Sequence, residues 1–271
     1  MLRDITLGQY YPKDSAVHRL DPRMKIVAVI AYIVLLFMVQ DFIGYGIVFL
    51  FVVLTVAVSG VPFGFILRGM KPILMILVLT FLINLFLYPG TVLWALGPLH
   101  ITEQGLHQAL FIACRLILLI LGTSLLTYTT KPMQLTDGFE SLLSPLARFG
   151  FPAHEIAIIM SIALRFIPML IQEADKIMKA QQARGADFES GNLLQRMKSL
   201  IPLLIPLFIG AFRIAQDLAM AMEARCYRGG RGRTHLHQLK LSRRDAAASA
   251  VLALFFVLTL LEPFAVSAIF G

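Results

Sequence analysis

The chain has 271 residues, of which 58% are hydrophobic and 15% are charged, and its mean hydropathy is +0.78. A soluble domain has roughly 45–50% apolar and about 25% charged residues, so this composition excludes an ordinary soluble protein. The formal net charge of +8 is what an inner-membrane protein accumulates in the loops that it keeps in the cytoplasm, and it requires no nucleic-acid partner. We therefore expect an all-α, polytopic protein of the lipid bilayer.

Five stretches are long and apolar enough to cross a bilayer as helices, because a hydrocarbon core of about 30 Å needs about 20 helical residues. They are residues 24–40, 42–59, 72–88, 105–128 and 246–270. Asp21 is a suitable N-cap and Pro22 a suitable first residue for the first helix. Residues 61–70 are expected to form a short interfacial helix before Pro72 opens the third span.

The distribution of basic residues predicts the orientation. Lys and Arg are concentrated in the N-terminal arm, in the loop after the second span and between Lys131 and Arg244, whereas residues 89–104 have none. Basic loops are retained in the cytoplasm, and the first 23 residues lack the apolar run of a signal peptide. The sequence predicts a cytoplasmic arm (1–23), a membrane domain of four spans (24–128), a cytoplasmic module (129–245) and a final span (246–271).

Two polar residues stand out inside the predicted spans. Arg115 is the cation expected deepest in a span, and an intramembrane arginine is a functional candidate by default. A structural partner, such as a backbone carbonyl, is an equally good explanation. Asn84 is the other, and a hydrogen bond to a neighbouring helix is its simplest explanation.

The predicted cytoplasmic module contains two long amphipathic patterns. Apolar residues recur at helical spacing from Ile156 to Gln181 and again from Met197 to Met222, which indicates two long helices. Pro168 should bend the first helix, and Pro202 and Pro206 should bend the second. Methionines are frequent on both, which suits either a partner-binding surface or ordinary core packing.

A short motif is repeated where these two patterns end. Residues 180–185 read AQQARG and residues 221–226 read AMEARC, so each copy is Ala-x-x-Ala-Arg followed by a small residue. An arginine in the last turn suits the negative end of the helix dipole, and Gly185 can close a helix in the left-handed conformation. The motifs are therefore either two helix C-caps or two equivalent heads that enter two equivalent sockets. The duplication favours the heads.

The usual chemical motifs are missing from the sequence. It has no Gly-rich phosphate loop followed by Lys and Ser/Thr, so we do not expect the chain to hydrolyse ATP. His235 and His237 lack nearby carboxylates and make a poor metal site, and no cofactor is predicted. The arginine–glycine tract from Arg228 to Arg233 is better explained as a contact with lipid head groups than with nucleic acid. Cys114 and Cys226 are expected to be reduced and unpaired.

Several motifs together resemble the transmembrane T component of energy-coupling factor (ECF) transporters, in its shared, multi-substrate form. They are ITLGQY at residues 5–10, HRLDPR at 18–23, the two Ala-Arg-small ends, and CYRG at 226–229. The resemblance implies a non-catalytic scaffold that joins two cytoplasmic ATPases to an interchangeable vitamin-binding membrane subunit, the S component. It also implies that two crossing coupling helices insert their terminal motifs into the ATPases. The docking residues it assigns here are Ala183, Arg184, Gly185, Ala224, Arg225 and Cys226. Cys226 departs from the glycine that is common at that position.

The sequence leaves alternatives to this function. A T component dedicated to one substrate, such as cobalt or nickel, would share the same motifs. A stand-alone permease would line a path through the spans with polar residues, which are scarce apart from Asn84 and Arg115. A membrane enzyme would need clustered catalytic groups at one interface, and none is visible.

Overall fold

The structure, a computed structural model, describes residues 10–96, 99–186, 188, 192–227, 229 and 241–270. In this part of the chain it is all-α apart from one short hairpin, as the sequence predicts. Its described residues divide into two compact units, one from residues 10–138 with 241–270 and the other from the described residues between 139 and 229. The beginning of the N-terminal motif at residues 5–9, most of the arginine–glycine tract and the His235/His237 pair lie outside the described residues.

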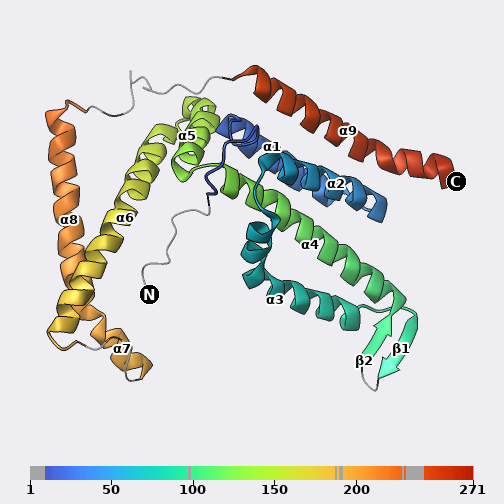
Figure 1. Ribbon diagram of the computed structural model, residues 1–271, viewed down its shortest axis with the longest axis horizontal. Helices are drawn as coiled ribbons and strands as arrows, with labels where there is room; N and C mark the ends of the chain where they lie inside the picture. The colour runs from blue at the N-terminus through green and yellow to red at the C-terminus, as the bar shows by residue number, and fades with distance from the viewer. Residues whose placement is uncertain are drawn as a thin grey trace. The chain divides into compact units, whose positions relative to one another are not determined.

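The first unit consists of five helices and a two-stranded hairpin (Figure 1). They are α1 (Pro22–Met38), α2 (Phe42–Ser59), α3 (Phe63–Leu87), β1 (Val92–Leu96), β2 (Leu99–Thr102), α4 (Glu103–Thr129) and α9 (Arg243–Phe270). Helix α4 packs against α1, α2 and α3, and α9 packs against α1 and α2. Only residues 39–41 separate α1 from α2.

Polar caps fix where two of these helices begin. The Asp21 carboxylate accepts a hydrogen bond from the backbone N–H of Arg23 (2.9 Å), and α1 starts at Pro22 as predicted. The Thr102 hydroxyl accepts one from the backbone N–H of Gly105 (3.0 Å), which satisfies a free donor in the first turn of α4.

Two expectations for residues 61–104 were wrong. Residues 61–70 do not form a separate helix, because α3 runs continuously from Phe63 to Leu87 with Pro72 inside it. Proline removes one helical hydrogen bond and kinks the axis, and Figure 1 shows α3 changing direction along its length.

The loop between α3 and α4 contains the antiparallel β1–β2 hairpin, with Val92 paired to Thr102. The Asn84 side chain donates a hydrogen bond to the Thr80 carbonyl of its own helix (2.8 Å). The expectation of a hydrogen bond to a neighbouring helix was therefore wrong.

The burial pattern within α2 is that of a membrane helix. One stripe is buried against the neighbouring helices and includes Tyr45, Val48, Val52 and Val56. The opposite face is exposed yet also apolar, with Leu50 58% and Leu54 57% exposed. A helix that is hydrophobic all round belongs in a large core or in lipid, so these exposed faces meet the bilayer.

Six described helices are long and apolar enough to cross a membrane, by length and composition alone. They include α2, α3, α4 and α9, together with α6 (Ala153–Ala183) and a stretch from Met197 to Ala224. Helix α1 has 17 residues, which is at the lower limit of the about 17–25 residues of a membrane-spanning helix. The chain is therefore a membrane-embedded protein, whereas the cytoplasmic placement of residues 129–245 stays a prediction.

The second unit contains the two long helices, and α5 lies across its boundary. Its elements are α5 (Pro132–Leu143), the 3₁₀ helix η2 (Ser144–Phe149), α6 (Ala153–Ala183), α7 (Leu193–Ser199) and α8 (Ile201–Ala224). The His154 ring nitrogen Nδ1 lies 2.7 Å from Glu140 Oε1 and ties α5 to the start of α6. The second long helix begins at Ile201 rather than near Met197. Pro202 lies in its first turn, where a missing N–H costs nothing, so this proline opens α8 instead of bending it.

Candidate docking site at two helix ends

The predicted heads lie at the C-terminal ends of α6 and α8. Helix α6 ends at Ala183, and the next residue, Arg184, has φ −89° and ψ 7°. Helix α8 ends at Ala224, and Arg225 has φ −90° and ψ 12°. The residue after each arginine is left-handed, with φ +87° at Gly185 and φ +54° at Cys226. The two motifs therefore have the same backbone conformation as well as the same sequence pattern.

Each end is closed by the same pair of backbone hydrogen bonds. At α6, Gly185 N–H donates to the Gln182 carbonyl (2.9 Å) and Ala186 N–H donates to the Gln181 carbonyl (3.0 Å). These two bonds define a Schellman C-cap, which satisfies carbonyls that a helix end otherwise leaves free.

Helix α8 repeats this arrangement residue for residue. Cys226 N–H donates to the Glu223 carbonyl (2.8 Å), and Tyr227 N–H donates to the Met222 carbonyl (3.0 Å). The sequence raised the question of whether a cysteine at this position changes the geometry of the second end. It does not change the capping pattern.

Cys226 is the one non-glycine residue with positive φ in the described part of the chain. A left-handed residue with a side chain costs roughly 1–2 kcal/mol, because its Cβ approaches the following carbonyl oxygen. Backbone strain of this kind is retained where the surrounding structure or the function requires it.

The arginine side chains are free to meet a partner. All six docking residues, 183–185 and 224–226, are exposed. Among the residues that the structure describes, neither Arg184 nor Arg225 has a hydrogen bond or ion pair from its guanidinium. Five N–H donors in a planar fork are thus available at each head, and such a fork matches a carboxylate or a pair of carbonyls.

Helices α6 and α8 pack against each other and carry the two heads to opposite ends of the pair. The end of α6 lies near the start of α8, and the two helices diverge from there, so the helix ends that carry the heads lie at opposite ends of α8 (Figure 1). A single small socket therefore does not hold both heads, and each requires its own binding surface.

Most of the apolar surface of α8 is not covered within this unit. No residue of α8 is buried. Its exposed large side chains include Ile205 (56%), Phe208 (62%), Ile209 (58%) and Phe212 (68%). A continuous exposed apolar surface marks contact with protein or lipid.

Arg115, the intramembrane candidate, is held by its own unit. Its Nε donates to the Tyr45 hydroxyl (2.8 Å) and its NH2 group donates to the Val39 carbonyl (3.2 Å). The guanidinium also lies over the rings of Phe37 and Phe111, at 5.3 and 5.0 Å from their centroids. Arg115 therefore lies level with the polar turn between α1 and α2, and these contacts favour the structural alternative.

The sequence analysis did not identify a buried polar cluster at the other end of α1. Lys25 is 5% exposed, and its Nζ donates to the carbonyls of His18 (3.1 Å) and Thr129 (2.9 Å) and to the Thr130 hydroxyl (3.3 Å). The Asp245 carboxylate accepts from the backbone N–H of Asp21 (2.8 Å). The sequence signal for this cluster was a lysine in the first turn of an apolar helix. Its ammonium can find hydrogen-bond acceptors there only through tertiary contacts.

Comparison with known proteins shows the family. The profile of the CbiQ family, described as Cobalt transport protein, matches residues 13–236. The energy-coupling factor transporter transmembrane protein EcfT of Thermosediminibacter oceani is 55% identical over 263 residues, which cover 97% of this chain and 99% of the relative. EcfT of Acidaminococcus fermentans is 52% identical, covering 95% and 96%, and EcfT of Bacillus subtilis is 44% identical, covering 96% and 98%. The match extends over almost the whole of each chain, the two arginine motifs included, and the chain therefore belongs to the EcfT family of transmembrane subunits of energy-coupling factor transporters.

Proposed function

We propose that this chain is the coupling subunit of its transporter. It links two cytoplasmic ATPases to an interchangeable, membrane-embedded S component that binds the substrate, and it catalyses no reaction itself. The observation that carries the proposal is the pair of exposed arginines on the same type of C-terminal cap, one on α6 and one on α8. Two equal heads fit two equal sockets, as a pair of similar ATPase subunits would provide.

The coupling follows from how each head would be held. A bidentate arginine fixes direction as well as distance, so a socket that grips Arg184 also sets the orientation of the last turn of α6. When ATP binding changes how the two sockets are oriented toward each other, the last turns of α6 and α8 that they hold are reoriented with them. The angle between the helices then changes, because a helix bends far less easily than a helix–helix contact slides.

The apolar surface of α8 would carry this change of angle to the S component. Phe208 and Phe212 lie one turn apart and are both more than 60% exposed, so they offer a broad contact for another apolar protein surface. Methionines on the same helices suit a surface that accepts different partners, because the unbranched thioether adapts its shape.

Two kinds of substrate remain for this proposal. The shared form serves several S components for vitamins or other micronutrients, and the repeated motifs together with the N-terminal arm favour it. The description of the matched family names cobalt, which favours a dedicated metal transporter as the second candidate. No group of three His, Cys, Asp or Glu residues that could hold a metal ion occurs among the described residues, and in either case the substrate would bind to another subunit. Uptake measured with vitamins and with cobalt distinguishes the two.

The proposal also includes a placement in the cell. We infer that the chain lies in the cytoplasmic membrane with its N-terminus and both arginine heads on the cytoplasmic side. The supporting observation is the concentration of Lys and Arg in the arm and between residues 131 and 244, against none in residues 89–104. ATP and the ATPases would be present on that side.

The decisive test replaces both heads. Arg184→Ala combined with Arg225→Ala removes the guanidiniums while keeping the backbone caps. A mere cap charge contributes about 0.3–1 kcal/mol, whereas a desolvated, hydrogen-bonded interface charge costs about 2–5 kcal/mol when truncated. We expect each single variant to weaken ATPase binding at least about 30-fold and the double variant to abolish pull-down of the ATPases and substrate uptake together. Lysine at both positions should rescue poorly, because a point charge does not reproduce the fork.

Matched controls are available on the same two helices. Arg165 of α6 and Arg213 of α8 are exposed arginines away from the helix ends, so Arg165→Ala with Arg213→Ala removes the same charge from the same helices. This control should assemble and transport normally at an equal level of membrane insertion. Normal assembly and uptake by the Arg184/Arg225 double variant would refute the proposal and reduce the motifs to helix caps.

A further inference from the structure

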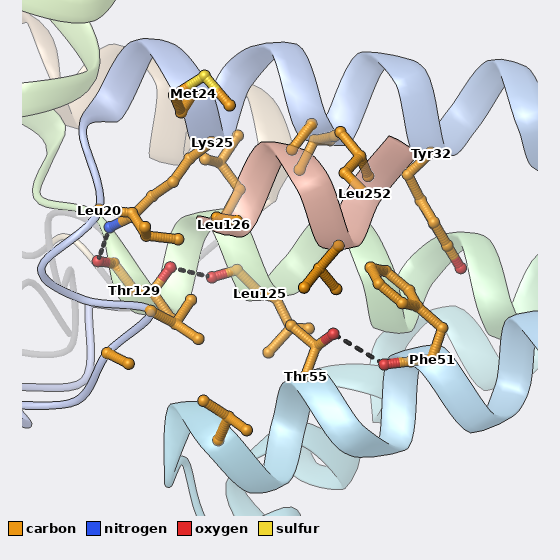
Figure 2. Close-up of a pocket in the computed structure, with 18 of the residues that line it drawn as sticks. Leu20, Met24, Lys25, Tyr32, Phe51, Thr55, Leu125, Leu126, Thr129 and Leu252 are labelled. Atoms are coloured by element: carbon orange, nitrogen blue, oxygen red, sulfur yellow. Dashed lines mark hydrogen bonds between the residues drawn. The ribbon is translucent and has the colours of Figure 1, made fainter. Parts of the chain in front are cut away.

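The membrane unit contains an apolar groove that no side chain among its described residues fills. It has a volume of about 540 Å³ and is bordered by the N-terminal arm and by α1, α2, α4 and α9 (Figure 2). Its size lies within the ~300–1,000 Å³ range of small-molecule sites. It is separate from the arginine heads, which belong to the other unit.

The wall of the groove is apolar even where its residues are polar. The Thr55 hydroxyl donates to the Phe51 carbonyl of its own helix (2.8 Å), and the Thr129 hydroxyl donates to the Leu125 carbonyl (2.7 Å). Both bonds are visible in Figure 2, and they occupy the hydroxyl hydrogens of the two threonines. At the far end, Tyr32 packs on Gly122 and donates its hydroxyl to the Leu118 carbonyl (2.7 Å). The groove thus offers no polar contact along most of its length.

Positive charge is confined to one end of the groove. Residues 13–25 and 241–247, which lie around that end, contain six basic and three acidic residues. Lys25 lines the groove there, but its ammonium is occupied by three protein oxygens. Arg244 also lines it, is exposed, and makes no hydrogen bond or ion pair within the described residues. The end of the groove therefore has an excess of basic residues and a guanidinium that interacts electrostatically with Asp14 but is not hydrogen-bonded to it.

The dimensions fit one leaflet of a bilayer. The groove is lined by α1 from Met24 to Tyr32, which at 1.5 Å per residue is about 12 Å, and Leu20 of the arm extends it beyond the start of the helix. The hydrocarbon of one leaflet is about 15 Å deep, half of a core of about 30 Å. An acyl chain entering beside Arg244 would thus end near Tyr32 with its headgroup at the membrane surface. Anionic lipids are enriched in the cytoplasmic leaflet, where basic residues attract them.

We propose that this groove is a binding site for an anionic phospholipid, with one acyl chain between α1, α2, α4 and α9 and its phosphate on Arg244. The bound chain completes the packing of the helices in the same way as a side chain would, and Arg244 selects the headgroup. The site rests on the proposed cytoplasmic placement of the N-terminal arm but not on the coupling function, because neither ATPase docking nor transport enters the argument.

The test counts lipids retained by the complete transporter. The full complex is reconstituted in vesicles of phosphatidylethanolamine with a minority of phosphatidylglycerol, extracted in mild detergent and measured by native mass spectrometry. Val251→Trp fills the groove from α9, and its control, Val257→Trp, places the same bulk on the same helix outside the lining. Arg244→Gln removes the headgroup contact, and its control is Arg243→Gln, an exposed neighbour that does not line the groove.

The expected result is one phosphatidylglycerol retained by the parent and by both controls. Val251→Trp should lose it, and Arg244→Gln should retain it about five-fold less, the factor that one basic residue contributes at an anionic surface. Equal retention by Arg244→Gln and Arg243→Gln would overturn the headgroup assignment. Retention by Val251→Trp, or loss of a protein subunit from that variant with the lipid still bound, would overturn the groove as a lipid site. Pull-down of the ATPases reports separately on coupling.

Discussion

The left-handed residues at the two helix ends allow a reciprocal exchange. Cys226 and Gly185 occupy the same position in the same cap, with φ +54° and +87°. A Cβ added at Gly185 would meet no heavy atom within 4 Å, so Gly185→Ala introduces no clash. The substitution adds the free-energy cost of a left-handed alanine and reduces the conformational freedom of the unfolded chain. Cys226→Gly makes the opposite change at the other end.

The magnitude follows from two opposing terms. A side chain in the left-handed region costs roughly 1–2 kcal/mol, and glycine costs about 0.4–1 kcal/mol through the greater freedom of the unfolded chain. The first term is larger, so we expect Cys226→Gly to stabilise the end of α8 by about 0.5–1 kcal/mol and Gly185→Ala to destabilise the end of α6 by a similar amount.

Hydrogen exchange measures each cap directly, because exchange reports the free energy of local opening. The Tyr227 amide, which bonds to the Met222 carbonyl, should exchange about two- to five-fold more slowly in Cys226→Gly. The Ala186 amide, which bonds to the Gln181 carbonyl, should exchange faster in Gly185→Ala by the same factor. Amides in the middle of α6 and α8 serve as the internal control. Faster exchange at Tyr227 in Cys226→Gly would refute the assignment of strain to Cys226.

Two further predictions concern the role of Arg115 and the orientation of the chain. Arg115→Met removes the bonds to Tyr45 and Val39, and because hydrogen bonds to charged groups contribute about 1.5–3 kcal/mol each, the melting temperature of the purified complex should fall while uptake per assembled transporter stays unchanged. Uptake lost from a complex that still assembles would instead give Arg115 a role in transport. In a background of Cys114→Ala and Cys226→Gly, a cysteine at Leu93 should react with an impermeant thiol reagent from outside intact cells, and one at Ser144 should not. The reverse labelling pattern would contradict the proposed orientation.

Local chemistry explains what could be predicted at the docking site. The repeated Ala-x-x-Ala-Arg-small pattern predicted two helix ends, and both helices end at the alanine before the arginine. C-caps are decided by hydrogen bonds within six residues, so neighbours in sequence contain the necessary information. The conformation of Cys226 was less predictable, because glycine is the usual left-handed residue and only the observed bonds show that cysteine adopts the same cap.

The sequence by itself determined that the chain is a bundle of membrane helices with two capped arginine ends, because hydropathy, proline positions and caps act over one helix. The tertiary structure alone decided which polar groups meet. Arg115 and Val39 are 76 residues apart in sequence, and Lys25 and Thr129 are 104 apart. No periodicity encodes such pairs. They form because a donor or cation placed among apolar helices must find an acceptor there or pay the cost of its burial. The groove beside Tyr32 has the same origin, since a space between four helices and an arm depends on how they pack and not on the pattern of any one of them.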